Sequence, residues 1–89
     1  MPEDKYKLIF HKYLSNSYDV DKFIEAFYEE WRLDRDDGTS ISYDTKFQRL
    51  MDRIFTSCDC YTKNPLKTHE ITEQELRNEV QLLSYIWWG

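Results

Sequence analysis

Apolar residues recur along four stretches of the chain, at the spacing that places them on one face of an α-helix. No stretch alternates apolar and polar residues as a half-buried strand does, and the chain holds only two glycines and two prolines. The pattern predicts an all-α fold, a small antiparallel four-helix bundle that forms a single domain over residues 1–89. The residues expected to face inward are Tyr6, Ile9, Phe10, Tyr13, Leu14, Val20, Phe23, Ile24, Phe27, Trp31, Phe47, Leu50, Met51, Ile54, Phe55, Cys58, Leu76, Val80, Leu83 and Trp87, with Leu82 and Ile86 widening the last stripe.

Helix start and stop signals bound these stretches. Pro2 suits a first helical turn, Asp19 suits an N-cap, and the Asp37–Gly38 step ends the second helix. Thr72, followed by Glu75, forms the capping box that opens the last helix. The expected helices span residues 3–14, 20–35, 47–58 and 72–87. The loop between the last two is long enough for a function of its own.

The negative charge of the chain is unevenly spread. The formal charge is −5, but nine acids and three bases give residues 19–44 a net charge of −6. Such a field repels nucleic acid and anionic membrane and attracts basic proteins; the alternative is a solvated face that maintains solubility. We find no signal peptide and no apolar run of about 18 residues, so we expect a cytoplasmic protein that does not contact membranes.

Catalytic and metal-binding patterns are missing from the sequence. His11 and His69 have no partner at a recognised spacing, and there is no phosphate-binding glycine loop. Cys58 and Cys60 stand too close together for the usual zinc pair, and a fourth ligand is missing. Cys58 also continues an apolar stripe, as a small core residue does. We therefore expect neither an enzyme nor a metal or other cofactor.

Acidic residues at helical spacing predict an anionic surface. Its members are the second-helix row Asp21, Glu25 and Glu29, the third-helix pair Asp52 and Asp59, and Asp34, Asp36 and Asp37 at the end of the second helix. Carboxylates arranged in this way imitate a phosphate backbone and suit a basic partner that handles nucleic acid. The chain itself is not expected to bind nucleic acid, because its bases are scattered and outnumbered.

Several stretches resemble the colicin D-type immunity family, which includes immunity proteins of contact-dependent growth inhibition systems. The resemblance implies a small bacterial helical bundle that binds and neutralises the nuclease domain, typically a tRNA-cleaving one, encoded beside it. The stretches are Asp19-Val20-x₂-Phe23-x₃-Phe27, Phe47-x₂-Leu50-x₃-Ile54-Phe55-x₃-Asp59-x-Tyr61 and Glu70-Ile71-Thr72-Glu73-Gln74-Glu75-Leu76-Arg77-x-Glu79-Val80.

The resemblance also implies roles for single residues. Asp59 matches the acid at the end of the family's third helix, which faces the catalytic basic residues of the toxin. The loop that often supplies a second acid reads Thr-Lys-Asn-Pro over residues 62–65, which leaves Asp52 or the second-helix acids to replace it. We expect Tyr61 and Trp88 to be exposed aromatic anchors in a 1:1 complex of the monomer with its toxin. The competing interpretation is a helical adaptor or regulatory subunit that binds through Tyr85, Trp87 and Trp88.

Overall fold

The structure is a computed structural model that describes residues 3–89; the expected role of Pro2 falls outside these residues. Within this range the chain forms four α-helices and one 3₁₀-helix, and no strand, so the predicted all-α class is confirmed. The elements are α1 (Asp4–Leu14), α2 (Val20–Asp36), η1 (Thr39–Ser42), α3 (Thr45–Cys60) and α4 (Glu73–Trp88).

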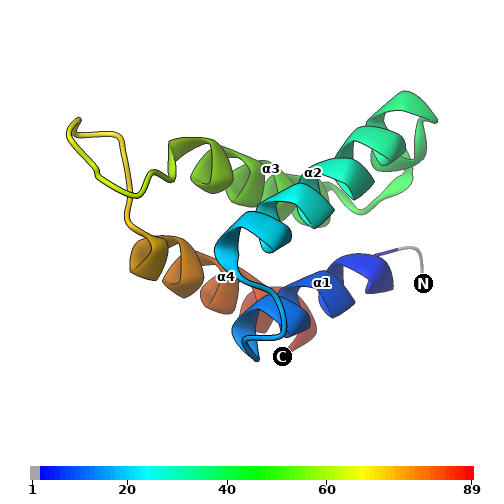
Figure 1. Ribbon diagram of the computed structural model, residues 1–89. Helices are drawn as coiled ribbons and strands as arrows, with labels where there is room; N and C mark the ends of the chain where they lie inside the picture. The colour runs from blue at the N-terminus through cyan, green and yellow to red at the C-terminus, as the bar shows by residue number, and fades with distance from the viewer. Residues whose placement is uncertain (1–2) are drawn as a thin grey trace.

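Consecutive helices run in opposite directions, as Figure 1 shows. Helix α1 packs against α2 and α4, and α3 packs against α4. The resulting body measures 37 × 25 × 21 Å. This arrangement is the antiparallel four-helix bundle that the four apolar stripes predict.

The core of the bundle is rich in aromatic rings. Tyr13 stacks on Phe23 with ring centroids 4.4 Å apart, and Phe10 and Phe27 extend the cluster. Large rings let a short chain fill its interior from few positions. The buried apolar residues are Tyr6, Ile9, Phe10, Tyr13, Phe23, Phe27, Phe47, Met51, Ile54, Cys58, Leu76, Val80 and Leu83, all of which the apolar pattern predicts.

Two residues that were expected to widen the α4 stripe lie outside the core. Leu82 and Ile86 remain 48% and 56% exposed. Helix α4 packs mainly against two neighbouring helices, α1 and α3, so a narrow stripe is enough to cover it. The expectation that both residues face inward is wrong.

The caps form where the sequence predicts them. The Asp19 carboxylate accepts a hydrogen bond from the Lys22 amide at 2.8 Å, and Thr72 and Glu75 form both bonds of the capping box, at 3.2 and 3.1 Å. Gly38 follows the end of α2 with φ of +81°, a conformation that favours glycine. Asp44 caps α3 at the Lys46 amide, a role that the apolar pattern did not indicate.

The loop between α3 and α4 is closed at its base by backbone hydrogen bonds. Ile71 donates to the Cys60 carbonyl at 3.0 Å and accepts from the Thr62 amide at 3.1 Å, which forms one isolated parallel bridge. Further out, the Glu70 carboxylate accepts from the amides of Leu66 and Lys67. These bonds hold the pKa of Glu70 below its usual value, so the loop is organised by its own residues.

Candidate partner-binding surface

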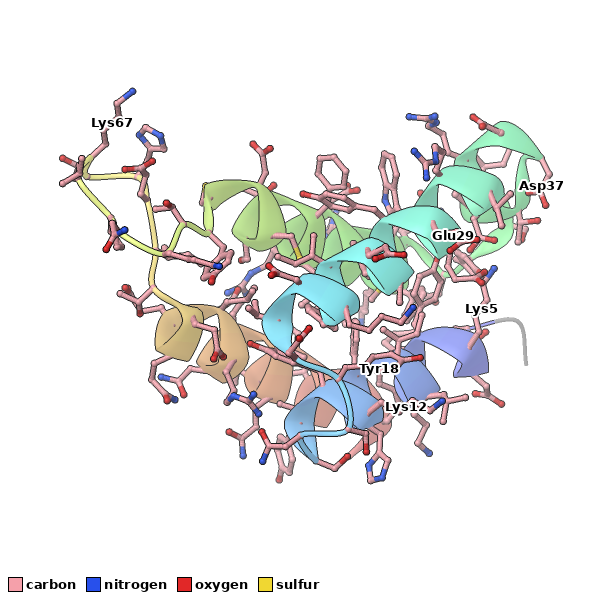
Figure 2. The ribbon with its side chains drawn as sticks, viewed as in Figure 1. Lys5, Lys12, Tyr18, Glu29, Asp37 and Lys67 are labelled. Carbon is pink, nitrogen blue, oxygen red and sulfur yellow. The ribbon has the colours of Figure 1, made fainter. Side chains whose placement is uncertain are left out.

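Asp34 is a buried structural residue. It is 3% exposed. Its Oδ1 accepts from the Lys5 ammonium at 2.5 Å, and its Oδ2 accepts from the hydroxyls of Tyr6 and Tyr43 at 2.6 and 2.7 Å. Lys5 extends from α1 toward α2 (Figure 2) and also pairs with Glu30 at 3.0 Å. The expectation that Asp34 lines an exposed anionic surface is therefore wrong.

The network around Asp34 keeps its carboxylate ionised. Burial by itself would raise the pKa of Asp34, but the hydrogen bonds from Lys5, Tyr6 and Tyr43 outweigh burial and hold the pKa below the usual 3.8. Burial, followed by the bond to this carboxylate, raises the pKa of both tyrosines. The network joins α1, α2 and the segment before α3.

The two expected aromatic anchors, Trp88 and Tyr61, pack largely against the core of the bundle. Trp88 is half-buried, with its ring 5.6 Å from that of Phe10 and 5.8 Å from that of Phe47. Tyr61 is also half-buried and packs against the core beside the bridge to Ile71. Neither side chain is the exposed ring that we expected, because both complete the interior of the bundle.

The other predicted acids are exposed, both the row Asp21, Glu25 and Glu29 and four further residues. Asp52 and Asp59 lie on α3, and Asp36 and Asp37 lie at the end of α2. Asp36 pairs with Arg35 at 3.0 Å. Asp37 accepts from the Thr39 amide at 2.8 Å, a contact that holds its pKa below the usual value.

These acids are spread along the molecule. Figure 2 shows Asp37 at the tip of α2, at the opposite end of the body from Lys67 in the loop that follows α3. Asp59 lies near that loop, two residues before the base of the loop at Tyr61. The exposed acids therefore form no single cluster, and Asp52 lies between the two ends.

A groove between α2 and α3 joins Asp52 to Asp59. It consists of two adjoining hollows, of about 140 and 220 Å³, which share Trp31 and Arg35. Asp52 borders the first hollow and Asp59 borders the second. Seven residues of helix separate the two carboxylates, a rise of roughly 10 Å. We call this feature the α2–α3 groove.

Aromatic rings form the floor of the α2–α3 groove. Phe55 lies between Trp31 and Tyr28, with ring centroids 4.5 and 5.2 Å away. All three rings are half-buried. Burial raises the pKa of Tyr28 to about 12, and the nearby Asp59 adds to the effect. The apolar pattern assigned Trp31 and Phe55 to the interior and did not single out Tyr28. Trp31 and Phe55 lie at the edge of their apolar stripes, and this position is the signal that they line a groove.

The two walls of the groove carry opposite charges. Asp52 and Asp59 come from α3, whereas Arg32 and Arg35 come from α2. The Arg35 guanidinium lies 5.3 Å from the centre of the Trp31 ring. The α2–α3 groove therefore combines the predicted acids with bases. A cation is therefore attracted by the α3 wall and repelled by the α2 wall.

The opposite side of α3 gathers bases, although the sequence suggested that bases are scattered. A broad hollow of about 610 Å³ lies between α3 and α4. It is lined by Lys46, Arg49, Leu50, Arg53, Ile86 and Trp87. Arg53 forms an ion pair with Glu79 of α4. Tyr85 is 72% exposed on α4, in the sequence next to Ile86.

Charged and aromatic side chains dominate these surfaces. Across residues 3–89, no three His, Cys, Asp or Glu side chains gather in a way that would hold a metal ion. Cys58 is buried, and burial raises the pKa of its thiol to about 12. None of the described helices has both the length and the apolar character needed to span a bilayer. Charged walls and aromatic floors instead suit the binding of another protein.

Comparison with known proteins identifies the family. A family model described as bacterial self-protective colicin-like immunity matches residues 1–84. No curated protein and no solved structure matches the chain. Because the match covers nearly the whole chain, this protein belongs to the family of bacterial colicin-like immunity proteins, which protect a cell against a toxin.

Proposed function

We propose that this immunity protein neutralises a nuclease toxin by placing the α2–α3 groove over the toxin's basic substrate-binding surface. Membership of the family supports the coarser statement, that the protein binds and neutralises a cognate toxin. The choice of a nuclease, and of a tRNA-cleaving one as in colicin D-type and contact-dependent systems, rests on the resemblance of the α3 and α4 sequences. Neutralisation takes place in the cytoplasm, where tRNA is found, in a 1:1 complex.

The observation that carries the proposal is the pairing of exposed carboxylates with a half-exposed aromatic floor. Asp52 and Asp59 take the positions of two phosphates, and Trp31 and Phe55 supply apolar area between them. Interfaces concentrate their binding energy in such aromatic centres. A standard interface of about 800 Å² per partner is roughly one-seventh of the 5859 Å² that the protein exposes, and it covers both hollows.

The charges of the two walls explain how the proposed complex can associate rapidly and how it discriminates among toxins. The acids accelerate encounter with a basic toxin. Arg32 and Arg35 place a penalty on any toxin whose cations fall on the α2 side. Asp36 and Asp37 extend the negative field beyond one end of the groove. The inhibitor therefore needs no catalytic group, only complementary shape and charge.

Reversal of Asp59 tests this proposal. The cognate toxin domain is co-expressed with wild-type protein, Asp59→Lys or Glu29→Lys, and the dissociation constant is measured on purified complexes. Glu29 is the matched control, because it is an exposed acid on the outer face of α2 and its reversal changes net charge equally (Figure 2). Loss of a charged partner that becomes buried costs about 2–5 kcal/mol, so Asp59→Lys is expected to weaken binding roughly 30- to 5,000-fold, mostly through faster dissociation.

The control defines the outcome. Glu29→Lys is expected to slow association slightly and to leave dissociation unchanged. Full protection by a folded Asp59→Lys variant would remove the α2–α3 groove from the mechanism. If only Glu29→Lys loses protection, the interface instead lies at the row Asp21, Glu25 and Glu29.

The α3–α4 face favours a second candidate function, that of a helical adaptor. Its exposed apolar residue Ile86 lines the same hollow as the bases Lys46 and Arg49. This combination suits an acidic amphipathic segment rather than a basic toxin. Arg49→Glu separates the two functions: it weakens an adaptor complex and leaves a complex through the α2–α3 groove intact.

A further inference from the structure

The hollow at the η1 end of the α2–α3 groove has an ionised floor. It lies between α2, η1 and α3 and has a volume of about 140 Å³. Asp34, which is 3% exposed, lines it. A carboxylate offers about four acceptor positions. Oδ2 accepts from Tyr6 and Tyr43, whereas Oδ1 accepts from Lys5, so Oδ1 retains capacity for one further donor.

Aromatic and acidic side chains form the walls of this hollow. Trp31 and Tyr43 contribute rings, and Asp52 contributes a second carboxylate from α3. A cation over the face of a tryptophan is attracted by the ring quadrupole. In the structure the Arg35 guanidinium already lies over Trp31, 5.3 Å from the ring centre. The two carboxylates, one of them with a free acceptor position, are the groups left to bind a further organic cation.

The charge balance also favours a cation. The charged side chains that line the hollow, together with all members of the ion-pair networks to which they belong, are four acids and two bases, a balance of −2. They are Asp34, Asp52, Glu30, Asp36, Lys5 and Arg35. An incoming ammonium or guanidinium group therefore meets net attraction even though Lys5 already neutralises part of the Asp34 charge.

We propose that this hollow receives one cationic side chain, a lysine or an arginine, from the bound partner. The proposal rests on the proposed function, because it names the group that the toxin inserts beside its contact with Asp59. A cavity of about 150 Å³ holds a molecule the size of benzene, so 140 Å³ admits the end of one such side chain. The hollow then sets the register of the complex, with one cation on Asp34 and Asp52 and others on Asp59.

Small cations test the hollow without the toxin. The full chain is titrated with n-butylammonium, n-butylguanidinium and the neutral n-butylurea, and the indole signal of Trp31 is followed by NMR, assigned with a Trp31→Phe variant. Millimolar binding of one or both cations is expected, with no binding of the urea. The comparison of the two cations shows whether lysine or arginine fits better. Equal binding of the urea, or an unchanged Trp31 signal with all three probes, overturns the proposal.

Two variants place the binding in the hollow. Asp52→Asn removes a wall carboxylate and is expected to weaken cation binding about fivefold. Ser40→Arg puts a guanidinium into the hollow from η1 and is expected to abolish probe binding. The matched control is Glu29→Gln, which removes one exposed carboxylate from the outer face of α2 and is expected to change affinity by less than twofold. Circular dichroism verifies that each variant is folded.

Toxin binding separates this proposal from the proposed function. Ser40→Arg and Asp52→Asn are expected to weaken toxin binding at least tenfold, as loss of an anchoring cation contact does. If toxin binding depends on Asp59 and is unchanged by Ser40→Arg, the anchoring role of the hollow is overturned and the proposed function stands. If wild-type protein binds no nuclease but the hollow still selects cations, only the proposed function is refuted and cation binding by the hollow stands.

Discussion

Removal of the Asp34 carboxylate is expected to destabilise the protein strongly. In Asp34→Ala the Tyr6 hydroxyl, on a side chain that is 1% exposed, loses its acceptor. An unsatisfied buried donor costs about 1–3 kcal/mol, and hydrogen bonds to a charged group are worth about 1.5–3 kcal/mol each. Breaking a buried ion pair usually costs about 3–5 kcal/mol.

For Asp34→Ala, the expected loss of stability lies toward the lower end of the range of about 3–5 kcal/mol for a broken buried ion pair. Lys5 is about one-third exposed and keeps its contact with Glu30 at 3.0 Å, so its charge is not left alone. Tyr43 is half-buried, and its hydroxyl can reach water. We expect a loss of about 2–4 kcal/mol, because the three bonds to one carboxylate are not additive.

Urea unfolding followed by far-UV circular dichroism measures this loss. With a slope of about 2 kcal/mol per molar urea, the middle of the usual range, the midpoint is expected to fall by roughly 1–2 M. Asp36→Asn is the control, because the Asp36 side chain is 62% exposed and its change is expected to stay within about 0.5 kcal/mol. A folded Asp34→Ala variant as stable as this control would refute the role of the network.

Acid provides a second test of the same carboxylate. The pKa of Asp34 in the folded protein lies below its usual 3.8, so at low pH the unfolded chain takes up the proton first. The stabilisation is complete above the unfolded pKa and disappears as the pH falls through the folded pKa. The stability difference between wild type and Asp34→Asn is therefore expected to shrink below about pH 4. A difference that grows on acidification contradicts an ionised Asp34.

Three further predictions follow from local contacts. Thr72→Ala removes half of the capping box and is expected to lower the free energy of unfolding by about 0.5–2 kcal/mol. In a timed reaction with iodoacetamide at pH 8, mass spectrometry is expected to find Cys60 modified well before Cys58, which is buried with its pKa raised to about 12. Glu70→Ala frees the amides of Leu66 and Lys67 and is expected to speed tryptic cleavage after Lys67; an unchanged cleavage rate would show that the loop is held by other contacts.

The sequence by itself determined the four α-helices and the caps of α2 and α4, but not the Asp44 cap of α3 or the helix η1. Periodicity and capping act over three or four residues, as the bond between Thr72 and the Glu75 amide illustrates. The sequence also placed Asp52 and Asp59 correctly outside the core, because both lie off the apolar stripe of α3. The family resemblance came from the same short stretches, and the match over residues 1–84 supports it at the level of colicin-like immunity.

The tertiary structure decided which polar and aromatic residues remain available to a partner. Asp34 looked like its neighbour Asp36, but its burial depends on Lys5, 29 positions earlier in the chain, and on Tyr43. Trp88 looked like an exposed anchor, but it completes a cluster with rings from α1 and α3.

The groove and the charges of its walls also depend on how the helices associate. A helical pattern shows which side of a helix turns inward, but not which neighbour covers that side. For that reason the alignment of Arg32 and Arg35 opposite Asp59, and the gathering of bases on the other side of α3, emerge only when the helices are packed. Local patterns therefore determined the elements, whereas long-range contacts determined the binding surface.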